Sequence, residues 1–176
     1  MRKLFLFSIL VPFLVSAQTQ GKTSSWNRLA FLEGKWEGKG AGEPGNSTVV
    51  RQYQFILQGA FLQVTNKSTF LPQEKNPKGE VHEDWGVFSR DRMRKLFVLR
   101  QFNIEGFVNQ YTLDTLQSDS TTLVFNTEAI ENIAPGWRAR EIYKTLGANE
   151  FVETFLLAAP SKDFELYAKT QFRRAR

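Results

Sequence analysis

The sequence predicts an all-β fold: an antiparallel up-and-down barrel of about ten strands, with a short N-terminal helix. Apolar and aromatic residues recur at period two through most of the chain, which is typical of strands with one buried face. Groups of turn-forming residues separate these stretches at roughly 8–12-residue spacing. Short connections favour antiparallel neighbours, and closing such a sheet removes its two exposed edges.

The N-terminus has the pattern of a secretory signal peptide over residues 1–17. Arg2 and Lys3 precede an apolar run over residues 4–15, and Val15-Ser16-Ala17 is a small-residue cleavage site. The alternative, an uncleaved anchor, is disfavoured because a bilayer needs about 20 residues. We therefore expect an exported protein, periplasmic or secreted, with residues 18–25 as an N-terminal extension.

The first ordered element is expected to be a short helix over residues 25–32. Ser24 or Ser25 can cap it, and Gly34 can end it. The first strand follows over residues 36–42, and we expect Trp36 to close one end of the barrel.

Nine further stretches with alternating apolar residues complete the predicted barrel: 49–55, 61–71, 81–88, 96–102, 107–113, 123–127, 137–143, 151–157 and 164–172. The segments between them contain Gly, Asn, Pro, Ser or Asp, as turns require. The chain is long enough for one domain with a sizeable core, which we place at residues 26–173. Residues 174–176 are expected to form a solvated basic tail.

Several strands carry a charged or amide residue on the same face as large apolar residues. These polar residues are Arg51, Glu83, Arg100, Asn109, Glu141 and Glu153. An unpaired buried charge is costly, so they either pair with one another or lie on faces that point outward. The alternative is that they line a cavity and hold the polar part of a ligand. The predicted ligand site combines them with the aromatic residues Trp36, Tyr53, Trp85, Phe102, Tyr111 and Tyr143.

The sequence lacks the residues that several other classes of protein require. The chain has no Cys, which excludes disulfides and Cys-ligated metals, and its one His, His82, has no nucleophile motif beside it. His82-Glu83-Asp84 has the composition of a metal site, but adjacent strand residues point to opposite faces, so no metal site is predicted. The net charge is +5, and basic residues are scattered and interleaved with acids, as in residues 90–95, so no nucleic-acid partner is predicted. We predict no catalytic residue.

Several segments together resemble a known family. Residues 29–40, Leu-Ala-Phe-Leu-Glu-Gly-Lys-Trp-Glu-Gly-Lys-Gly, resemble the opening of nitrobindin-like and related calycin-type, lipocalin-like barrel domains. Residues 81–90 resemble the middle His-x-x-x-Gly strand of that family. Residues 100–111 and 131–141 look like a bacterial exported branch of unknown function. The resemblance extends over residues 26–173.

The resemblance implies a ten-stranded barrel and, in its haem-binding members, chemistry on nitric oxide or peroxynitrite. In those members the iron ligand is a His in the last strand. Residues 164–173 of this chain contain no His, and His82 matches only the middle strand. Tyr167 is a residue of the last strand that can ligate ferric iron. We predict no cofactor, and haem binding is kept as an alternative.

The predicted function is therefore an exported barrel, monomeric or homodimeric, that binds a small apolar or amphipathic molecule in its interior. The first alternative is a haem protein acting on nitric oxide or peroxynitrite, and the second is a structural or interaction domain without a ligand. An interior void of a few hundred Å³ would favour ligand binding over the structural alternative.

Overall fold

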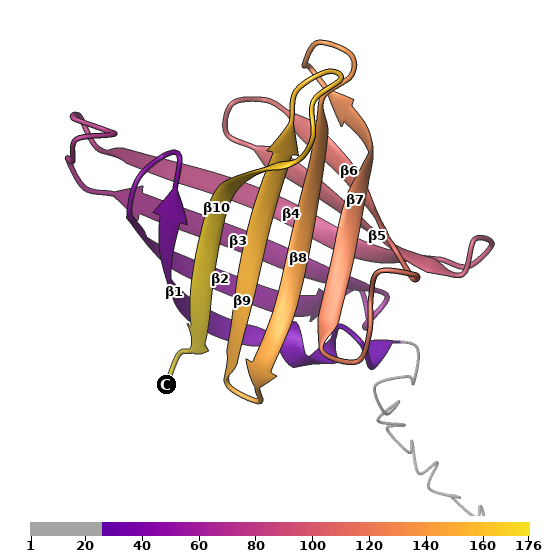
Figure 1. Cartoon of the computed structure of the whole chain (residues 1–176). Coiled ribbons are helices and arrows are strands. Elements are labelled where there is room, and N and C mark those ends of the chain that lie inside the picture. Colours follow the sequence, from indigo (N-terminus) through magenta and orange to yellow (C-terminus); the bar gives the residue numbers. More distant parts are fainter. Residues whose placement is uncertain (1–25) are drawn as a thin grey trace, which may run out of the picture.

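The computed structural model describes residues 26–176, so the predicted signal peptide and extension lie outside the described residues. Ten strands form a closed barrel in which each strand pairs antiparallel with the next and β1 pairs with β10 (Figure 1). The prediction of an all-β up-and-down barrel is confirmed. The strands are β1 (Gly34–Gly42), β2 (Ser47–Ile56), β3 (Phe61–Phe70), β4 (Glu80–Asp91), β5 (Leu96–Asn103), β6 (Val108–Leu113), β7 (Thr122–Glu131), β8 (Arg138–Gly147), β9 (Glu150–Ala158) and β10 (Glu165–Arg174).

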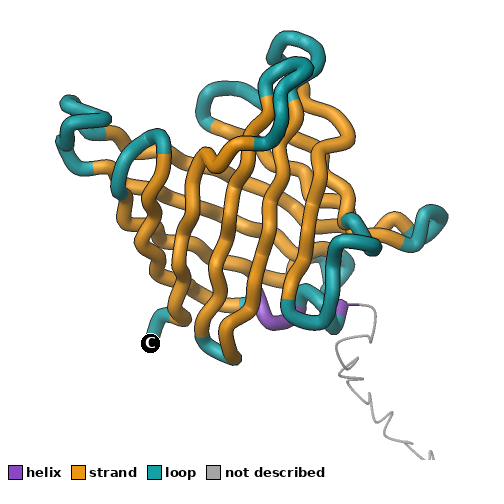
Figure 2. Tube along the Cα trace, viewed as in Figure 1, coloured by secondary structure: helices purple, strands orange, loops and turns teal. Residues whose placement is uncertain are grey.

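The predicted N-terminal helix is a 3-10 helix, η2 (Ala30–Leu32), which lies at the lower end of the barrel in Figure 2. Trp26, Leu29 and Leu32 are buried at a spacing of three residues. A 3-10 geometry aligns residues three apart, so this spacing suits it better than an α-helix. Within residues 26–176 no helix is both long and apolar enough to cross a membrane.

Trp36 and Arg174 close this end of the barrel, which we call the base. Trp36 is fully buried, and its Nε1 donates a hydrogen bond to the Leu32 carbonyl at 2.7 Å. The Arg174 guanidinium lies 4.2 Å from the indole centroid and donates to the Phe31 and Glu33 carbonyls at 2.9 and 2.6 Å. Arg174 therefore belongs to β10, and the solvated tail is shorter than expected from the sequence.

β1 gives the barrel one thin wall, because its inward positions beyond Trp36 are glycines. A Cβ atom on Gly38 would lie 2.8 Å from both the Phe172 ring and Thr170 Cγ2. Phe172 therefore packs directly on the β1 backbone, and it stacks on Phe151 with ring centroids 4.7 Å apart.

Aromatic side chains fill the half of the barrel next to the base. Phe125 and Tyr143 meet edge to face at 5.9 Å, and Phe88 meets Phe125 in the same way at 5.6 Å. Such edge-to-face pairs add about 0.5–1.5 kcal/mol to the burial of the rings. The opposite end, which we call the mouth, is surrounded by the connections at 43–46, 71–79, 104–107, 132–137 and 159–164.

The predicted inner faces of β4 and β5 are wrong by one residue. Glu83 and Trp85 lie on the outer face of β4, and Arg100 and Phe102 lie on the outer face of β5. Trp85 and Phe102 are 40% and 41% exposed, and their rings pack 5.2 Å apart on the outside. The alternation was ambiguous because both strands carry apolar residues on both faces, as residues 96–99 show.

Candidate ligand-binding cavity

The half of the barrel next to the mouth holds a cavity of about 450 Å³. Its two main walls differ in chemistry. The apolar wall comes from β7, β8, β9 and the connection after β7, and it comprises Ile130, Ile133, Ala139, Phe155 and Leu157. The polar wall comes from β3, β4, β5 and the connection after β5, and it comprises Asn66, Ser68, Glu80, His82, Asp84, Asn103 and Glu105.

An ion pair between Arg51 and Glu153 forms the floor of this cavity. Arg51 Nη2 donates to Glu153 Oε2 at 2.8 Å, and Arg51 Nη1 contacts the second carboxylate oxygen. Both residues are only 8% exposed. Arg51 Nε also donates to Asn66 Oδ1 at 2.8 Å, and the guanidinium lies 4.5 Å from the Phe172 ring centroid. The planar guanidinium thus meets a carboxylate, an amide and a ring at once.

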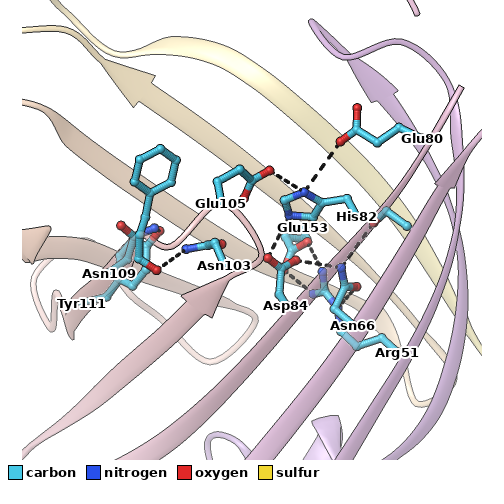
Figure 3. A network of polar contacts seen from close by, with 12 residues as sticks. Arg51, Asn66, Glu80, His82, Asp84, Asn103, Glu105, Asn109, Tyr111 and Glu153 are labelled. Carbon is cyan, nitrogen blue, oxygen red and sulfur yellow. Dashed lines mark hydrogen bonds and ion pairs between the residues drawn. The ribbon is translucent and has the colours of Figure 1, made fainter. Parts of the chain in front are cut away.

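From this floor a continuous polar network runs up the wall to the mouth (Figure 3). Asn66 Nδ2 donates to Asp84 Oδ2 at 3.0 Å, and the other oxygen of Asp84 lies 2.8 Å from His82 Nε2. His82 Nδ1 lies 2.8 Å from Glu105 Oε1 and 3.9 Å from Glu80 Oε1. Within residues 26–176, no buried side-chain nitrogen or oxygen lacks a hydrogen-bond partner. The wall is therefore organised before any ligand arrives.

His82 is surrounded by carboxylates. The hydrogen bond to Asp84 raises the pKa of His82 to about 9, against the effect of burial and with further help from the charges of Asp84, Glu105 and Glu80. At neutral pH the imidazole is therefore protonated on both nitrogens and carries a positive charge. Among the described residues, four carboxylates line the cavity, from Glu80, Asp84, Glu105 and Glu153, and their charge is opposed by Arg51 and His82. The cavity thus carries an excess of negative charge.

A second buried acid, Glu141, lies on β8 opposite Phe155 of β9 and does not line the cavity. It is 5% exposed and accepts a hydrogen bond from the Tyr143 hydroxyl. Burial raises its pKa to about 7, with a further contribution from the charge of Glu153, while the bond from Tyr143 acts in the opposite direction. The single guanidinium of Arg51 is engaged by Glu153, so Glu141 has no cation of its own.

We expect Glu141→Gln to stabilise the protein at pH 8 by roughly 1–3 kcal/mol and to change little at pH 5. A raised carboxyl pKa contributes stability below the ordinary value of 4.5, and this contribution is lost as the pH rises through about 7. At pH 8 the natural residue must be charged inside the barrel, whereas glutamine stays neutral. Urea unfolding at both pH values measures the difference, with the exposed Glu165→Gln as control. Equal effects at the two pH values would contradict the expectation.

The residues predicted from the sequence to bind the ligand fall into three groups. Three of them line the cavity: Arg51, Asn109 and Glu153. Five are buried in the aromatic half or at the base: Trp36, Tyr53, Tyr111, Glu141 and Tyr143. Four lie on the outer face: Glu83, Trp85, Arg100 and Phe102. The first two groups are linked, because Arg51 Nη1 donates to Tyr53 Oη at 3.2 Å and Asn109 Nδ2 to Tyr111 Oη at 3.1 Å.

Both interpretations of the inward polar residues hold in part. Arg51 and Glu153 pair with each other, as the first interpretation expected, and they also face a cavity, as the second expected. Arg100 and Glu83 point outward, where Arg100 Nη1 donates to Ser89 Oγ at 3.2 Å and Glu83 meets Lys67 at 3.5 Å.

Sequence reasoning missed all seven residues of the polar wall: Asn66, Ser68, Glu80, His82, Asp84, Asn103 and Glu105. The spacing Glu80-x-His82-x-Asp84 places three of them on one face of a strand. This spacing indicates a polar wall only if that face of the strand points into the barrel. Glu105 lies in the turn after β5, and nothing in the sequence brings it next to His82. Tyr167, the possible iron ligand of the last strand, lines the mouth with its ring edge-on to Phe155 at 5.5 Å.

Comparison with known proteins supports the fold alone. No protein-family model matches the chain, and no curated protein matches it by sequence. The structure of Rv2717c from M. tuberculosis matches with a TM-score of 0.65 and 15% identity, over 87% of this chain and 98% of that one. A de novo designed fluorescence-activating β-barrel matches with a TM-score of 0.40 and 11% identity, over 85% of this chain and 98% of the designed one. The match to Rv2717c shows a shared fold, which in this chain is a closed barrel of ten antiparallel strands.

Proposed function

We propose that this barrel binds a small amphipathic molecule in the cavity at its mouth. The observation that carries the proposal is the cavity of about 450 Å³, in which an apolar wall faces a polar one. Binding sites for small molecules range from about 300 to 1,000 Å³ and combine apolar surface with a few polar anchors. The predicted signal peptide supports action outside the cytoplasm.

The two walls define the ligand's chemistry. Ile130, Phe155 and Leu157 offer surface for an apolar body, at about 0.8 kcal/mol for each buried methylene group. The carboxylates of the polar wall only accept hydrogen bonds, so they favour a head group that donates them. The excess of negative charge favours a cationic donor, such as an amine, over a neutral one.

Binding of simple alkyl probes tests this proposal. Calorimetric titration is expected to rank n-octylamine above n-octanol, and n-octanol above octanoate. Leu157→Asp, on the apolar wall, is expected to weaken octylamine binding at least about tenfold, because it removes apolar contact and puts a charge against the alkyl chain. Leu156→Asp is the matched control, since Leu156 does not line the cavity and is the next residue on the same strand.

Two results would count against the proposal. One is octanoate binding as tightly as octylamine, which would show that the polar wall does not favour a cationic head group. The other is an equal loss from Leu156→Asp and Leu157→Asp, which would place the binding outside the cavity. Native mass spectrometry of protein purified from its own host then identifies the natural ligand by its mass.

A further inference from the structure

Three potential metal ligands converge at the rim of the cavity. One atom from each of Glu80, His82 and Glu105 can be chosen so that all lie within 4.8 Å of one another. His82 Nδ1 is the central atom, 2.8 Å from Glu105 Oε1 and 3.9 Å from Glu80 Oε1. Ligands of a metal bound at about 2.0–2.2 Å are about 3–3.5 Å apart, so small side-chain movements would bring these three into range.

The backbone holds these residues in place. Glu80 and His82 are two residues apart on β4 and therefore share its inner face. Glu105 lies in the tight turn between β5 and β6, where Gly106 N donates to the Asn103 carbonyl at 2.8 Å and Asn103 N donates to the Phe107 carbonyl at 3.1 Å. One strand, β4, and the tight turn after β5 thus bring the three ligands together.

The second nitrogen of His82 is already oriented. Asp84 Oδ1 lies 2.8 Å from Nε2, and Asn66 Nδ2 holds the other oxygen of Asp84 at 3.0 Å. Histidines that bind metals characteristically donate their other N–H to a carboxylate, which fixes the tautomer and the ring. With Nε2–H on Asp84, Nδ1 is the nitrogen that faces the two glutamates, and a metal ion bound there would displace the Nδ1 proton that contacts Glu105. This arrangement is more specific than a group of acids on a surface.

We propose that Glu80, His82 and Glu105 bind a divalent transition-metal ion of the Zn²⁺ type, with Asp84 as the residue that positions His82. One imidazole nitrogen and two carboxylate oxygens suit such an ion, and the excess of cavity carboxylates offsets its charge. Three protein ligands leave at least one coordination position open toward the cavity, where water can bind. The zinc site uses carboxylates of the polar wall that also face the proposed amphipathic ligand, so zinc binding and ligand binding are tested separately.

Zinc titration of metal-free protein without a histidine tag tests this site. At pH 8 we expect one Zn²⁺ per chain and no detectable Mg²⁺ binding at the same concentration, because Mg²⁺ prefers oxygen ligands. Since the chain has one histidine, its side-chain ¹⁵N spectrum reports the site without ambiguity. The Nδ1 resonance is expected to shift on zinc addition, while Nε2 keeps its proton.

Variants separate the ligands from their neighbours. His82→Asn and Glu105→Gln are each expected to weaken zinc binding at least about tenfold, and Asp84→Asn to weaken it about 10–100-fold. Glu83→Gln is the matched control, because Glu83 is also a carboxylate of β4 but lies on the outer face. Glu105 is in an exposed turn, so its replacement tests the site without threatening the barrel.

Zinc affinity unchanged in Glu105→Gln, or an Nδ1 resonance that does not move, would overturn the proposal. Loss of binding in Glu83→Gln as large as in Glu105→Gln would also overturn it, since it would indicate general attraction to acidic residues. Octylamine binding is measured without metal. A failure of the zinc titration therefore leaves the proposed function standing, and a failure of the octylamine titration leaves the zinc site standing.

Discussion

Replacing Arg51 with leucine is expected to lower the free energy of unfolding by about 3–5 kcal/mol, the usual cost of breaking a buried ion pair from one side. Glu153, which is 8% exposed, would lose both of its bonds to the guanidinium. Asn66 Oδ1 would lose its donor as well. In a domain of this size, each kcal/mol corresponds to about 2–4 °C in Tm, so the loss is measurable by heat or urea.

The double variant Arg51→Leu/Glu153→Leu is the informative control. It removes both charges, and buried ion pairs replaced by apolar residues are often neutral or stabilising. We therefore expect it to recover most of the lost stability at pH 7. If the double variant were as unstable as Arg51→Leu, the loss would come from packing at the floor and not from an uncompensated charge.

The second large effect is expected at the base. Trp36→Ala should cost about 3–5 kcal/mol, because it removes a fully buried aromatic side chain and leaves a cavity. The same change removes the bond to the Leu32 carbonyl and the ring on which Arg174 stacks. Thermal unfolding followed by near-UV circular dichroism measures the loss.

Trp85→Ala provides a control with the same change in residue type. Trp85 is 40% exposed on the outer face, where its main aromatic neighbour is Phe102. We expect a cost below about 1 kcal/mol, as for most surface substitutions. Similar losses in the two variants would mean that the base does not depend on Trp36 and would contradict the assigned role of this residue.

The sequence was sufficient where a strand has one clearly apolar face. β9 alternates Phe151, Glu153 and Phe155 on its inner face, and Trp36 follows the Gly34 turn, so both were placed correctly. The number of strands and their antiparallel order followed from the same alternation and from the short connections. These features are local, and local patterns are what a single sequence records.

The polar wall could not be predicted because it reverses the usual rule. On β4 the polar residues His82 and Asp84 face inward, while Val81 and Trp85 face outward. The partner of Arg51 was also undetermined, since three glutamates were possible and the actual one is 102 residues away. Register around a closed sheet is set by all ten pairings together, so no single strand reveals it.

The pairing of β1 with β10 has a kinetic consequence. It joins Trp36 to Arg174, whereas every other pairing joins strands adjacent in sequence. Closing so long a loop costs conformational entropy before the contact forms, so this pairing is expected to form more slowly than the local ones. Until β10 docks, β1 and β9 each have an unpaired edge, and Phe172 is missing from the aromatic half. During synthesis, barrel and cavity therefore form together, and only after the last strand has emerged.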